Sequence, residues 1–290
     1  MKILVLGATG MLGYSIFSNL SEVSDFDVFG TVRNISGKDD YFKNTSNRLV
    51  FGVDIYDFDS VISIVNDINP DVVINCIGLI KQHDISKLHT DAIYVNSLLP
   101  HKLAKLCSAS GAKLIHFSTD CVFTGADGGY TEDSNPDSID LYGSSKRLGE
   151  VDYGEHLTLR TSIIGHELSS NVSLVDWFLS QSTSVNGFSK AVFSGLPTAY
   201  IAKLLIEKIL PVGNLSGLYH LSVDPIDKFT LLSLVSKVYS HDIEIQPSEQ
   251  LTMDRSLNSN KLRNELGLIT PSWSELIDFM FVDYNKRYKK

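Results

Sequence analysis

The chain has 290 residues, of which 43% are hydrophobic and 20% are charged, and its formal net charge at pH 7 is −9. This composition is typical of a folded globular protein and excludes a disordered one. The acidic balance disfavours nucleic acid and anionic membranes as partners. No apolar run reaches the roughly 18 residues of a membrane span, and the apolar start is too short for a signal peptide. We therefore expect a cytoplasmic protein.

The three cysteines are Cys76, Cys107 and Cys121, and they form no CxxC pair. An odd set without that spacing predicts neither a disulfide framework nor a zinc site. The eight histidines also lack the spacing that is typical of metal ligands. We therefore expect no bound metal.

The first half of the chain alternates short β-branched runs with helical patterns. Strands that are apolar throughout and alternate with helices indicate a parallel sheet covered on both faces. The fold class predicted for this half is therefore α/β, a Rossmann-type doubly wound parallel sheet. Strands are predicted at residues 3–6, 28–32, 49–53, 71–77 and 113–118, and helices at residues 11–20, 57–68 and 89–110.

The pattern loosens after residue 160, where loops rich in Ser, Asn and Pro separate the elements. The length allows about two domains at roughly 150 residues each. We predict a dinucleotide-binding domain at residues 1–160 and a smaller, mostly helical C-terminal substrate domain at residues 161–189 and 223–290. Helices are predicted at residues 172–181, 200–210, 230–240 and 272–288, with one strand at 217–221.

A glycine-rich loop follows the first predicted strand and begins the first predicted helix. Gly7, Gly10 and Gly13 have the spacing GxxGxxG. Glycines let the backbone turn tightly and approach a pyrophosphate, while the helix N-terminus supplies N–H donors and partial positive charge. An ordinary strand–helix turn is the alternative, but this position between strand and helix favours a dinucleotide site. The predicted cofactor contacts are Gly7, Thr9, Gly10, Met11, Leu12 and Gly13.

The end of the second predicted strand bears on the choice of cofactor. About 20 residues after the glycine loop, NAD-binding chains carry an acid that binds the ribose 2′-OH. This chain has Thr31, Val32 and Arg33 there instead. Arg33 can pair with the 2′-phosphate of NADP through two hydrogen bonds, and a solvated surface arginine is the alternative. The missing acid favours NADPH, with NADH left open.

Tyr142 and Lys146 form a YxxxK pattern within a helix predicted at residues 141–153. A spacing of four residues places them on one face of that helix. A phenol has an ordinary pKa of about 10, and a neighbouring ammonium group lowers that pKa toward the working range of an acid–base catalyst. Such pairs also occur by chance on surface helices. This pair follows a strand that brings Ser118 and Thr119 to the ligand-binding edge of the sheet, which favours catalysis.

The glycine loop, YxxxK and five further segments resemble the extended short-chain dehydrogenase/reductase family, in particular its dTDP-4-dehydrorhamnose reductases. The similarity covers nearly the whole chain, and the STD and RTS segments make it specific. The resemblance implies that residues 190–222 return to the dinucleotide-binding domain. The segments are PDVVIN at residues 70–75, STDCVF at 118–123, LRTS at 159–162, GLYHL at 217–221 and RSLN at 255–258.

The resemblance implies a catalytic triad of Thr119, Tyr142 and Lys146. In that role, Tyr142 donates a proton to the C4 carbonyl oxygen of a sugar nucleotide, while NADPH supplies hydride to the carbon. Thr119 hydrogen-bonds the same oxygen. Lys146 orients the nicotinamide ribose and tunes Tyr142, so Tyr142 and Lys146 also belong to the cofactor site.

The same resemblance implies further cofactor contacts after two other strands. Asp54 and Ile55 match the stretch that binds adenine. Ile77 and Gly78 match a loop that passes the cofactor. We therefore expect these four residues to lie near the glycine loop.

Two departures from the family pattern bear on the substrate. Family dehydratases carry a glutamate where Cys121 stands, and a thiol cannot replace that carboxylic acid, which argues against dehydration. Rhamnose-forming reductases usually carry tyrosine at the Cys121 position and tryptophan at the Ile163 position. Cys121 has no histidine pattern to mark a general base, so we interpret it as pocket lining rather than a nucleophile.

The predicted substrate contacts come from several segments. We expect Thr119, Cys121 and Ile163 to line the sugar pocket. Lys81 and His83 are candidates for binding the substrate diphosphate or sugar, although loop cations are more often solvated. A diphosphate clamp and a surface arginine fit Arg255 almost equally.

These features predict NADPH-dependent reduction of a nucleotide-linked 4-keto-6-deoxy sugar. The resemblance implies a role in surface polysaccharide synthesis. The predicted partner is a nucleotide-diphosphate sugar, and a homodimer stays open. One alternative is an NAD-retaining epimerase, which would consume no bulk NADPH. Another is a non-catalytic, dinucleotide-binding regulatory subunit, against which the intact Thr119, Tyr142 and Lys146 argue. The sequence leaves open the dTDP or UDP carrier, the exact sugar and the product stereochemistry.

Overall fold

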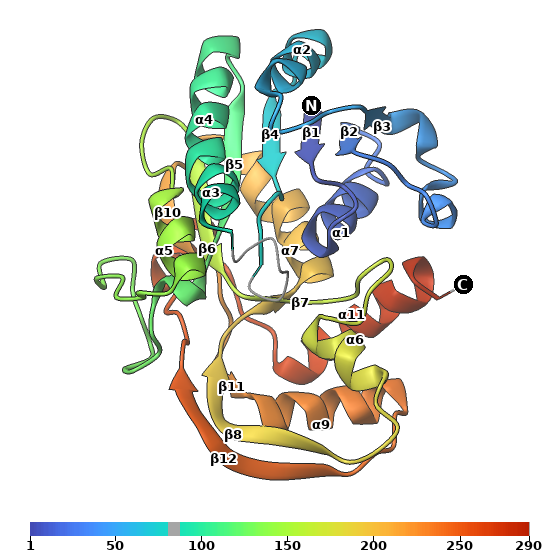
Figure 1. The fold of residues 1–290 in the computed structure, drawn as a ribbon, viewed down its shortest axis with the longest axis vertical. Helices are drawn as coiled ribbons and strands as arrows, with labels where there is room; N and C mark the ends of the chain where they lie inside the picture. The colour runs from blue at the N-terminus through green and yellow to red at the C-terminus, as the bar shows by residue number, and fades with distance from the viewer. Residues whose placement is uncertain (81–87, 290) are drawn as a thin grey trace.

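A parallel sheet of seven strands forms the core of the larger part of the molecule (Figure 1). The computed structural model describes residues 1–80 and 88–289. The strand order is β10-β6-β5-β4-β1-β2-β3, and every neighbouring pair is parallel. The carboxyl ends of the strands therefore meet at one edge, where doubly wound sheets bind ligands. The strands are β1 (Lys2–Leu6), β2 (Asp27–Val32), β3 (Leu49–Phe51), β4 (Val72–Asn75), β5 (Lys113–Thr119), β6 (Leu157–Thr161) and β10 (Gly217–His220).

Helices cover both faces of this sheet because successive strand side chains enter two different buried clusters. Ile3 and Val5 of β1 pack in a cluster that includes α1 and α7, whereas Leu4 and Leu6 pack with α2 and α4. This arrangement confirms the predicted Rossmann-type doubly wound α/β fold. The helices are α1 (Met11–Leu20), α2 (Phe58–Ile68), α3 (His89–Ala92), the π-helical turn η4 (Ile93–Leu98), α4 (Leu99–Ser110), α5 (Leu141–Leu148), α7 (Thr198–Leu204), the π-helical turn η6 (Leu205–Ile209) and α8 (Leu210–Val212).

The smaller part of the molecule contains a second sheet, which lies beyond the carboxyl ends of the large sheet's strands (Figure 1). Its strand order is β11-β8-β12, and β8 is antiparallel to β11 and parallel to β12. The strands are β8 (Val185–Phe193), β11 (Ile226–Asp227) and β12 (Ile245–Asp254), with β7 (Ile163–Ile164) paired to β9 (Leu196–Pro197). The helices are α6 (Leu174–Leu179), α9 (Lys228–Tyr239), α10 (Asn260–Leu266) and α11 (Trp273–Arg287).

The long strands β8 and β12 depart from the mostly helical pattern predicted for this part. Most side chains of β12 are exposed, and the strand contains Pro247 together with several polar residues. It therefore has neither the apolar run nor the regular alternation that indicates a strand. Pairing with β8 holds it in place, with a register shift between Ser248 and Thr252. The helices expected at residues 230–240 and 272–288 are present as α9 and α11.

Two local features of the chain affect the site. Helix α5 ends at Leu148, earlier than predicted, and Gly149 follows it. A Cβ at Gly149 would lie 1.9 Å from the Asn96 carbonyl oxygen, so only glycine fits this close approach. Strand β10 pairs with β6 although β7, β8 and β9 intervene in the chain. The predicted division into domains stays a proposal.

Three 3-10 turns complete the described elements: η1 (Asp39–Phe42), η2 (Ser46–Arg48) and η5 (Asp120–Val122). Within residues 1–80 and 88–289, no helix is long and apolar enough to cross a membrane.

Candidate active site

The glycine loop joins β1 to α1 and leaves the helix N-terminus open. Gly7 has a φ of 84°, and its N–H donates to Thr31 Oγ1 at 3.1 Å. A Cβ at Gly13 would lie 2.1 Å from the Gly7 carbonyl oxygen, so only glycine fits there. The first turn of α1 contains no acidic residue, and its N–H groups have no acceptors within the helix. These backbone N–H donors can bind a dinucleotide pyrophosphate. The predicted contacts Thr9, Gly10, Met11 and Leu12 lie between Gly7 and Gly13 in the same segment.

The residues predicted for the adenosine end lie after neighbouring strands. Arg33 follows β2, is exposed, and makes no ion pair within the described part of the chain. Burial and a hydrogen bond with Asp91 raise the pKa of Tyr56 to about 12, and the charge of Arg33 opposes that shift. Asp54 is exposed and accepts a hydrogen bond from the Tyr56 N–H at 3.0 Å, while Ile55 is half-buried. Arg33 therefore lies within electrostatic range of Tyr56, which directly follows Asp54 and Ile55 in the chain.

The Ile77–Gly78 loop connects the glycine loop with the YxxxK pair. A Cβ at Gly7 would lie 2.9 Å from Ile77 Cγ1, so the two loops are in contact. A Cβ at Gly78 would lie 3.7 Å from Lys146 Nζ. The structure therefore brings these predicted cofactor residues together at the carboxyl ends of β1 and β4.

Asn96 holds this loop and was not predicted from the sequence. It lies in the π-helical turn η4 and is 1% exposed. Its Oδ1 accepts from the Leu79 N–H at 2.9 Å, and its Nδ2 donates to Ser145 Oγ at 3.2 Å. Asn96 thus joins the Ile77–Gly78 loop to helix α5. A π-helical turn is common at functional sites, but helical periodicity in the sequence does not reveal it.

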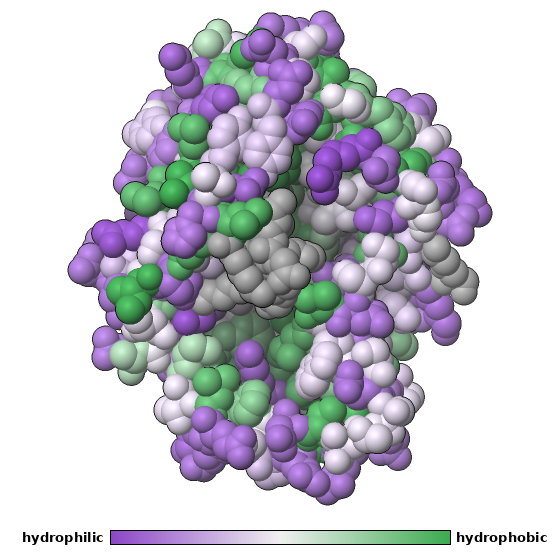
Figure 2. Space-filling view, viewed as in Figure 1, coloured by the Kyte–Doolittle hydropathy of each residue, from purple (hydrophilic) through white to green (hydrophobic). Residues whose placement is uncertain are grey.

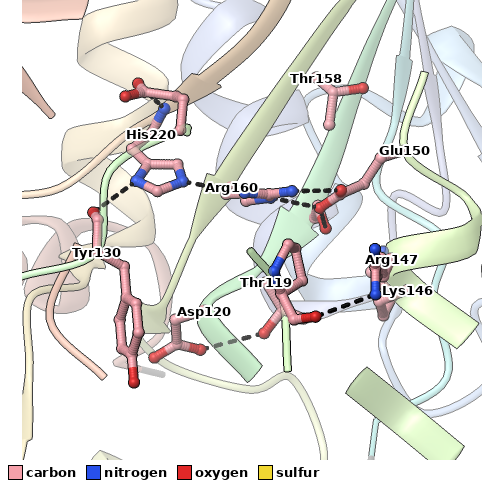
Figure 3. Close-up of polar contacts among 12 residues, drawn as sticks. Thr119, Asp120, Tyr130, Lys146, Arg147, Glu150, Thr158, Arg160 and His220 are labelled. Atoms are coloured by element: carbon pink, nitrogen blue, oxygen red, sulfur yellow. Dashed lines mark hydrogen bonds and ion pairs between the residues drawn. The ribbon is translucent and has the colours of Figure 1, made fainter. Parts of the chain in front are cut away.

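Thr119, Tyr142 and Lys146 converge at the end of β5. Lys146 is buried, and its Nζ donates to the Phe117 carbonyl oxygen at 2.6 Å (Figure 3). The Thr119 hydroxyl accepts from the Cys121 N–H and lies 3.1 Å from Asp120 Oδ1. Tyr142 is half-buried and shares a hydrogen bond with Thr119. The structure therefore places the three predicted catalytic side chains in one cluster.

Burial dominates the protonation of this cluster. It raises the pKa of Tyr142, and the hydrogen bond that Tyr142 shares with Thr119 only partly offsets that shift. The expectation that Lys146 lowers the pKa of Tyr142 toward neutrality is therefore not met in this structure. Burial lowers the pKa of Lys146 to about 8, against the opposing charge of Glu150. At neutral pH the cluster holds a protonated phenol beside a protonated amine, a combination that can donate a proton.

A buried polar network continues from the cluster to the edge of the sheet (Figure 3). Glu150 accepts from Ser118 Oγ and from Arg160 Nε and Nη2, each at 2.7 Å. Arg160 Nη1 lies 3.3 Å from His220 Nε2, and His220 Nδ1 lies 3.0 Å from the Tyr130 carbonyl oxygen. Since a carbonyl only accepts, Nδ1 carries the proton and Nε2 accepts from Arg160. Burial lowers the pKa of His220 to about 3, so it is neutral.

The predicted substrate residues are only partly placed by the structure. Cys121 and Ile163 are half-buried near Thr119 and on β7, respectively. Arg255 Nη1 donates to Cys121 Sγ at 3.3 Å. Lys81 and His83 lie outside the described residues. Figure 2 shows this face of the molecule hollowed between the part that holds the large sheet and the part that holds β8 and β12.

Lys228 is a further cation at this site that the sequence analysis did not find. It begins helix α9 and is half-buried. Burial lowers its pKa, while the charge of Asp120 raises it and that of Arg255 lowers it. A lone lysine at a helix start carries no signal in one sequence, because the neighbours that define it are distant along the chain.

Comparison with protein families and curated proteins gives one long match and several shorter ones. A family model described as the RmlD substrate binding domain matches residues 1–284. Methionine adenosyltransferase 2 subunit beta of Danio rerio is 30% identical over 156 residues, which are 53% of this chain and 44% of that protein. A protein of Haloferax volcanii named a probable low-salt glycan biosynthesis reductase is 33% identical over 147 residues, which are 50% of this chain and 46% of that protein. The chain thus matches somewhat under half the length of these curated relatives.

Solved structures match over nearly the whole length. The crystal structure of dTDP-4-dehydrorhamnose reductase from Bacillus anthracis in complex with NADP has a TM-score of 0.79 and is 21% identical to this chain. The match covers 97% of this chain and 99% of that one. At this identity the similarity shows the shared fold.

Proposed function

This chain belongs to the RmlD substrate binding domain family, and we propose that it is an NADPH-dependent reductase of a nucleotide-linked 4-keto-6-deoxy sugar. The observation that carries the proposal is the cluster of Thr119, Tyr142 and Lys146, with Gly78 of the cofactor loop beside Lys146 Nζ. The NADP complex of the Bacillus anthracis reductase supports the same cofactor class. A role in surface polysaccharide synthesis, a cytoplasmic location and a homodimer stay predictions.

In the proposed reaction the bound nicotinamide supplies the hydride. Tyr142 donates its phenolic proton to the C4 carbonyl oxygen, and Thr119 hydrogen-bonds that oxygen. Lys146 holds its charge beside the Ile77–Gly78 loop, which suits a contact with the ribose of the cofactor. The raised pKa of Tyr142 keeps it protonated before the substrate arrives.

The cofactor side of the proposal rests on the glycine loop and Arg33. The N–H groups between Gly7 and Gly13 bind the pyrophosphate. Arg33 has no carboxylate partner in the described part of the chain, so its guanidinium is available to a 2′-phosphate. NADPH is therefore the preferred cofactor of the proposed reaction, and NADH a weaker one.

A second candidate function is that of a dinucleotide-binding subunit of a larger enzyme. The similarity to methionine adenosyltransferase 2 subunit beta over about half of the chain favours it. The preserved cluster of Thr119, Tyr142 and Lys146 favours the reductase. A subunit that only binds the dinucleotide would turn over no 4-keto sugar.

The test is a panel of dTDP- and UDP-linked 4-keto-6-deoxy sugars, with and without an N-acetyl group. Each is incubated with the protein and NADPH or NADH, and cofactor oxidation is followed by absorbance. We expect stoichiometric NADPH oxidation with at least one sugar and identify its product by NMR. Isomerisation without net oxidation would indicate an epimerase, and absence of both reactions would contradict the proposal.

A further inference from the structure

We propose that His116 is a positioning residue for the Ile77–Gly78 loop and that it acts through the side-chain amide of Asn75. The pair holds the loop in the orientation in which it contacts a dinucleotide. This inference rests on the proposed function only in that the protein binds NADPH or NADH. It applies equally to a subunit that binds the dinucleotide without reducing a sugar.

His116 and Asn75 lie side by side on two neighbouring strands of the large sheet. They pair in the parallel register of β4 and β5, and Asn75 is the last residue of β4 (Figure 1). Each of the two residues is 1% exposed. Asn75 Nδ2 lies 3.1 Å from His116 Nδ1, and Asn75 Oδ1 accepts from the Ile77 N–H at 3.1 Å. A short chain of hydrogen bonds therefore runs from β5 to the loop.

The direction of each hydrogen bond follows from the groups that make it. A backbone N–H only donates, so the amide oxygen of Asn75 faces Ile77 and the amide NH₂ faces His116. His116 Nδ1 therefore accepts, and the proton of the neutral ring is on Nε2. Burial and the charges of Lys146 and His101 lower the pKa of His116 well below its usual range. The ring is thus neutral at pH 7, and Nδ1 stays an acceptor.

An acceptor at this place determines which way the amide of Asn75 faces. The oxygen and the nitrogen of a side-chain amide have nearly the same shape, so packing alone does not distinguish the two orientations. With the amide reversed, its oxygen would face the acceptor of His116 and its NH₂ would face the Ile77 N–H. Both hydrogen bonds would be lost, which is costly among buried groups. His116 therefore fixes the amide in the orientation that holds the loop.

The second ring nitrogen of His116 separates this role from one in stability alone. His116 Nε2 is buried, and no described residue accepts its proton, which is unfavourable for folding. His156 is also buried, but it uses both nitrogens. Its Nδ1 accepts from the Leu114 N–H at 3.1 Å, and its Nε2 lies 3.0 Å from the Ala104 carbonyl oxygen. The hydrogen bond to Asn75 is thus what His116 contributes.

The loop that Asn75 holds lies between two parts of the proposed cofactor site. A Cβ at Gly7 would lie 2.9 Å from Ile77 Cγ1, and a Cβ at Gly78 would lie 3.7 Å from Lys146 Nζ. The glycine loop is proposed to bind the pyrophosphate, and Lys146 the nicotinamide ribose. A change at the Ile77 N–H therefore acts on a part of the dinucleotide that NADPH and NADH share.

The residues on either side of Ile77 are fixed independently. The Cys76 N–H donates to the Leu6 carbonyl oxygen at 3.1 Å, and the Leu79 N–H donates to Asn96 Oδ1 at 2.9 Å. Removal of His116 therefore leaves both ends of the loop attached. We expect a local change in its geometry rather than loss of the loop.

The experiment measures dinucleotide binding by the full chain in a double-mutant cycle. Nicotinamide fluorescence gives the dissociation constants of NADPH and NADH for the wild type, His116→Phe, Asn75→Leu and the double variant. Phenylalanine keeps a ring but has no nitrogen, and His116→Leu is a second removal variant. The matched control is His156→Phe, which changes a buried histidine just before β6, at the opposite edge of the large sheet. Thermal unfolding shows whether each variant is folded.

We expect His116→Phe to weaken binding of NADPH and NADH by the same factor, about tenfold, because the Ile77 N–H loses an oriented acceptor. Asn75→Leu should have a similar effect, and the double variant no larger one, because the two residues act through one chain of hydrogen bonds. His116→Asn should restore binding, since its side-chain oxygen can take the place of Nδ1. In His156→Phe both dissociation constants should equal those of the wild type, whatever happens to its unfolding temperature.

Three results overturn the positioning role. The first is that the folded His116→Phe and His116→Leu variants bind both cofactors as tightly as the wild type does. The second is that the effects of His116→Phe and Asn75→Leu add in the double variant, which would make them independent. The third is that both removal variants unfold while His156→Phe folds, which would assign His116 to stability.

The NADPH oxidation panel separates these failures from failure of the proposed function. Reduction of a 4-keto sugar with unchanged dissociation constants would remove only the positioning role. The expected changes in binding without turnover of any sugar would support the positioning role and favour the dinucleotide-binding subunit. Absence of NADPH and NADH binding to the wild type would overturn both proposals.

Discussion

Lys146 and Arg160 belong to the part that holds the large sheet, whereas Lys228 and Arg255 directly follow strands β11 and β12 of the small sheet. The two pairs of cations differ in what surrounds their charges. Lys146 donates to a backbone carbonyl at 2.6 Å, and Arg160 makes two hydrogen bonds of 2.7 Å to the carboxylate of Glu150. Arg255 instead contacts a thiol, and Lys228 makes no ion pair with any residue the structure describes.

This difference indicates that the parts holding the large and the small sheet have different roles in the proposed reaction. A cation whose partners are protein groups is fixed before the ligand binds, which suits positioning and electrostatic stabilisation of a reaction. A cation that makes no ion pair gains stabilisation when an anion arrives, which suits ligand binding. The charge of the buried Asp120 already acts on both Arg255 and Lys228. The large sheet thus provides the proposed catalytic groups, and the small sheet carries Arg255, a predicted substrate contact, together with Lys228.

The largest expected effect comes from removing the proposed proton donor on the large-sheet side. Tyr142→Phe should lower kcat by about 10²- to 10⁴-fold, because the C4 oxygen loses its general acid. The matched control is Tyr153→Phe, which removes the hydroxyl of a half-exposed tyrosine bonded to His101. Steady-state NADPH oxidation measures both. Equal rates in the wild type and Tyr142→Phe would show that Tyr142 is not the acid.

A second test removes the negative charge of Glu150, which pairs with Arg160 in the part that holds the large sheet. Glu150→Gln leaves the Arg160 guanidinium buried without a carboxylate and should cost about 3–5 kcal/mol in the free energy of unfolding. The control is Glu249→Gln, which removes an exposed partner 3.9 Å from Lys190 and should cost less than about 0.5 kcal/mol. Urea denaturation measures both values. Similar losses in the two variants would mean that the buried pair has no special role.

The pH dependence of kcat/KM tests the charge of Lys146. Its lowered pKa of about 8 means that the amine is protonated below that pH and loses its charge as pH rises through it. We therefore expect kcat/KM for the keto sugar to fall about tenfold per pH unit above roughly pH 8. In Lys146→Arg, whose side chain stays charged, this decline should disappear. A decline that persists in Lys146→Arg would assign the titration to another group.

The smallest expected effect concerns Arg33, an exposed cation at the far end of the proposed cofactor site. Arg33→Ala should raise the KM for NADPH by about tenfold and leave that for NADH nearly unchanged, because only NADPH carries the 2′-phosphate. Arg48→Ala, at another described arginine near the surface, serves as the control. Equal changes in KM for NADPH and NADH would show that Arg33 does not discriminate between the two cofactors.

The large sheet and the catalytic cluster were predictable because their signals are local. Apolar runs predicted the strands, and GxxGxxG predicted the loop before α1. The YxxxK spacing predicted that Tyr142 and Lys146 lie on one helix face. The end of β5 then placed Thr119 beside them. The pKa of Tyr142 was not predictable, since burial exceeds the influence of a neighbouring charge.

The small sheet and the position of Lys228 beside the predicted contact Arg255 were not predictable, for a physical reason. Strand β12 is polar and mostly exposed, so pairing with β8 rather than burial specifies it. Lys228 and Arg255 are 27 positions apart in number and become neighbours only through their shared pairing with Val192. Asn96 likewise acts through a π-helical turn that leaves no mark on the sequence pattern.

Isotope transfer tests the proposed reduction most directly. The protein is incubated with a nucleotide 4-keto-6-deoxy sugar and NADPH that carries deuterium at C4 of the nicotinamide, in either stereochemical form. The account predicts that one of the two forms gives a product with one deuterium at C4 of the sugar, matched by one oxidised cofactor. A product without deuterium from both forms, or conversion without cofactor oxidation, would contradict it.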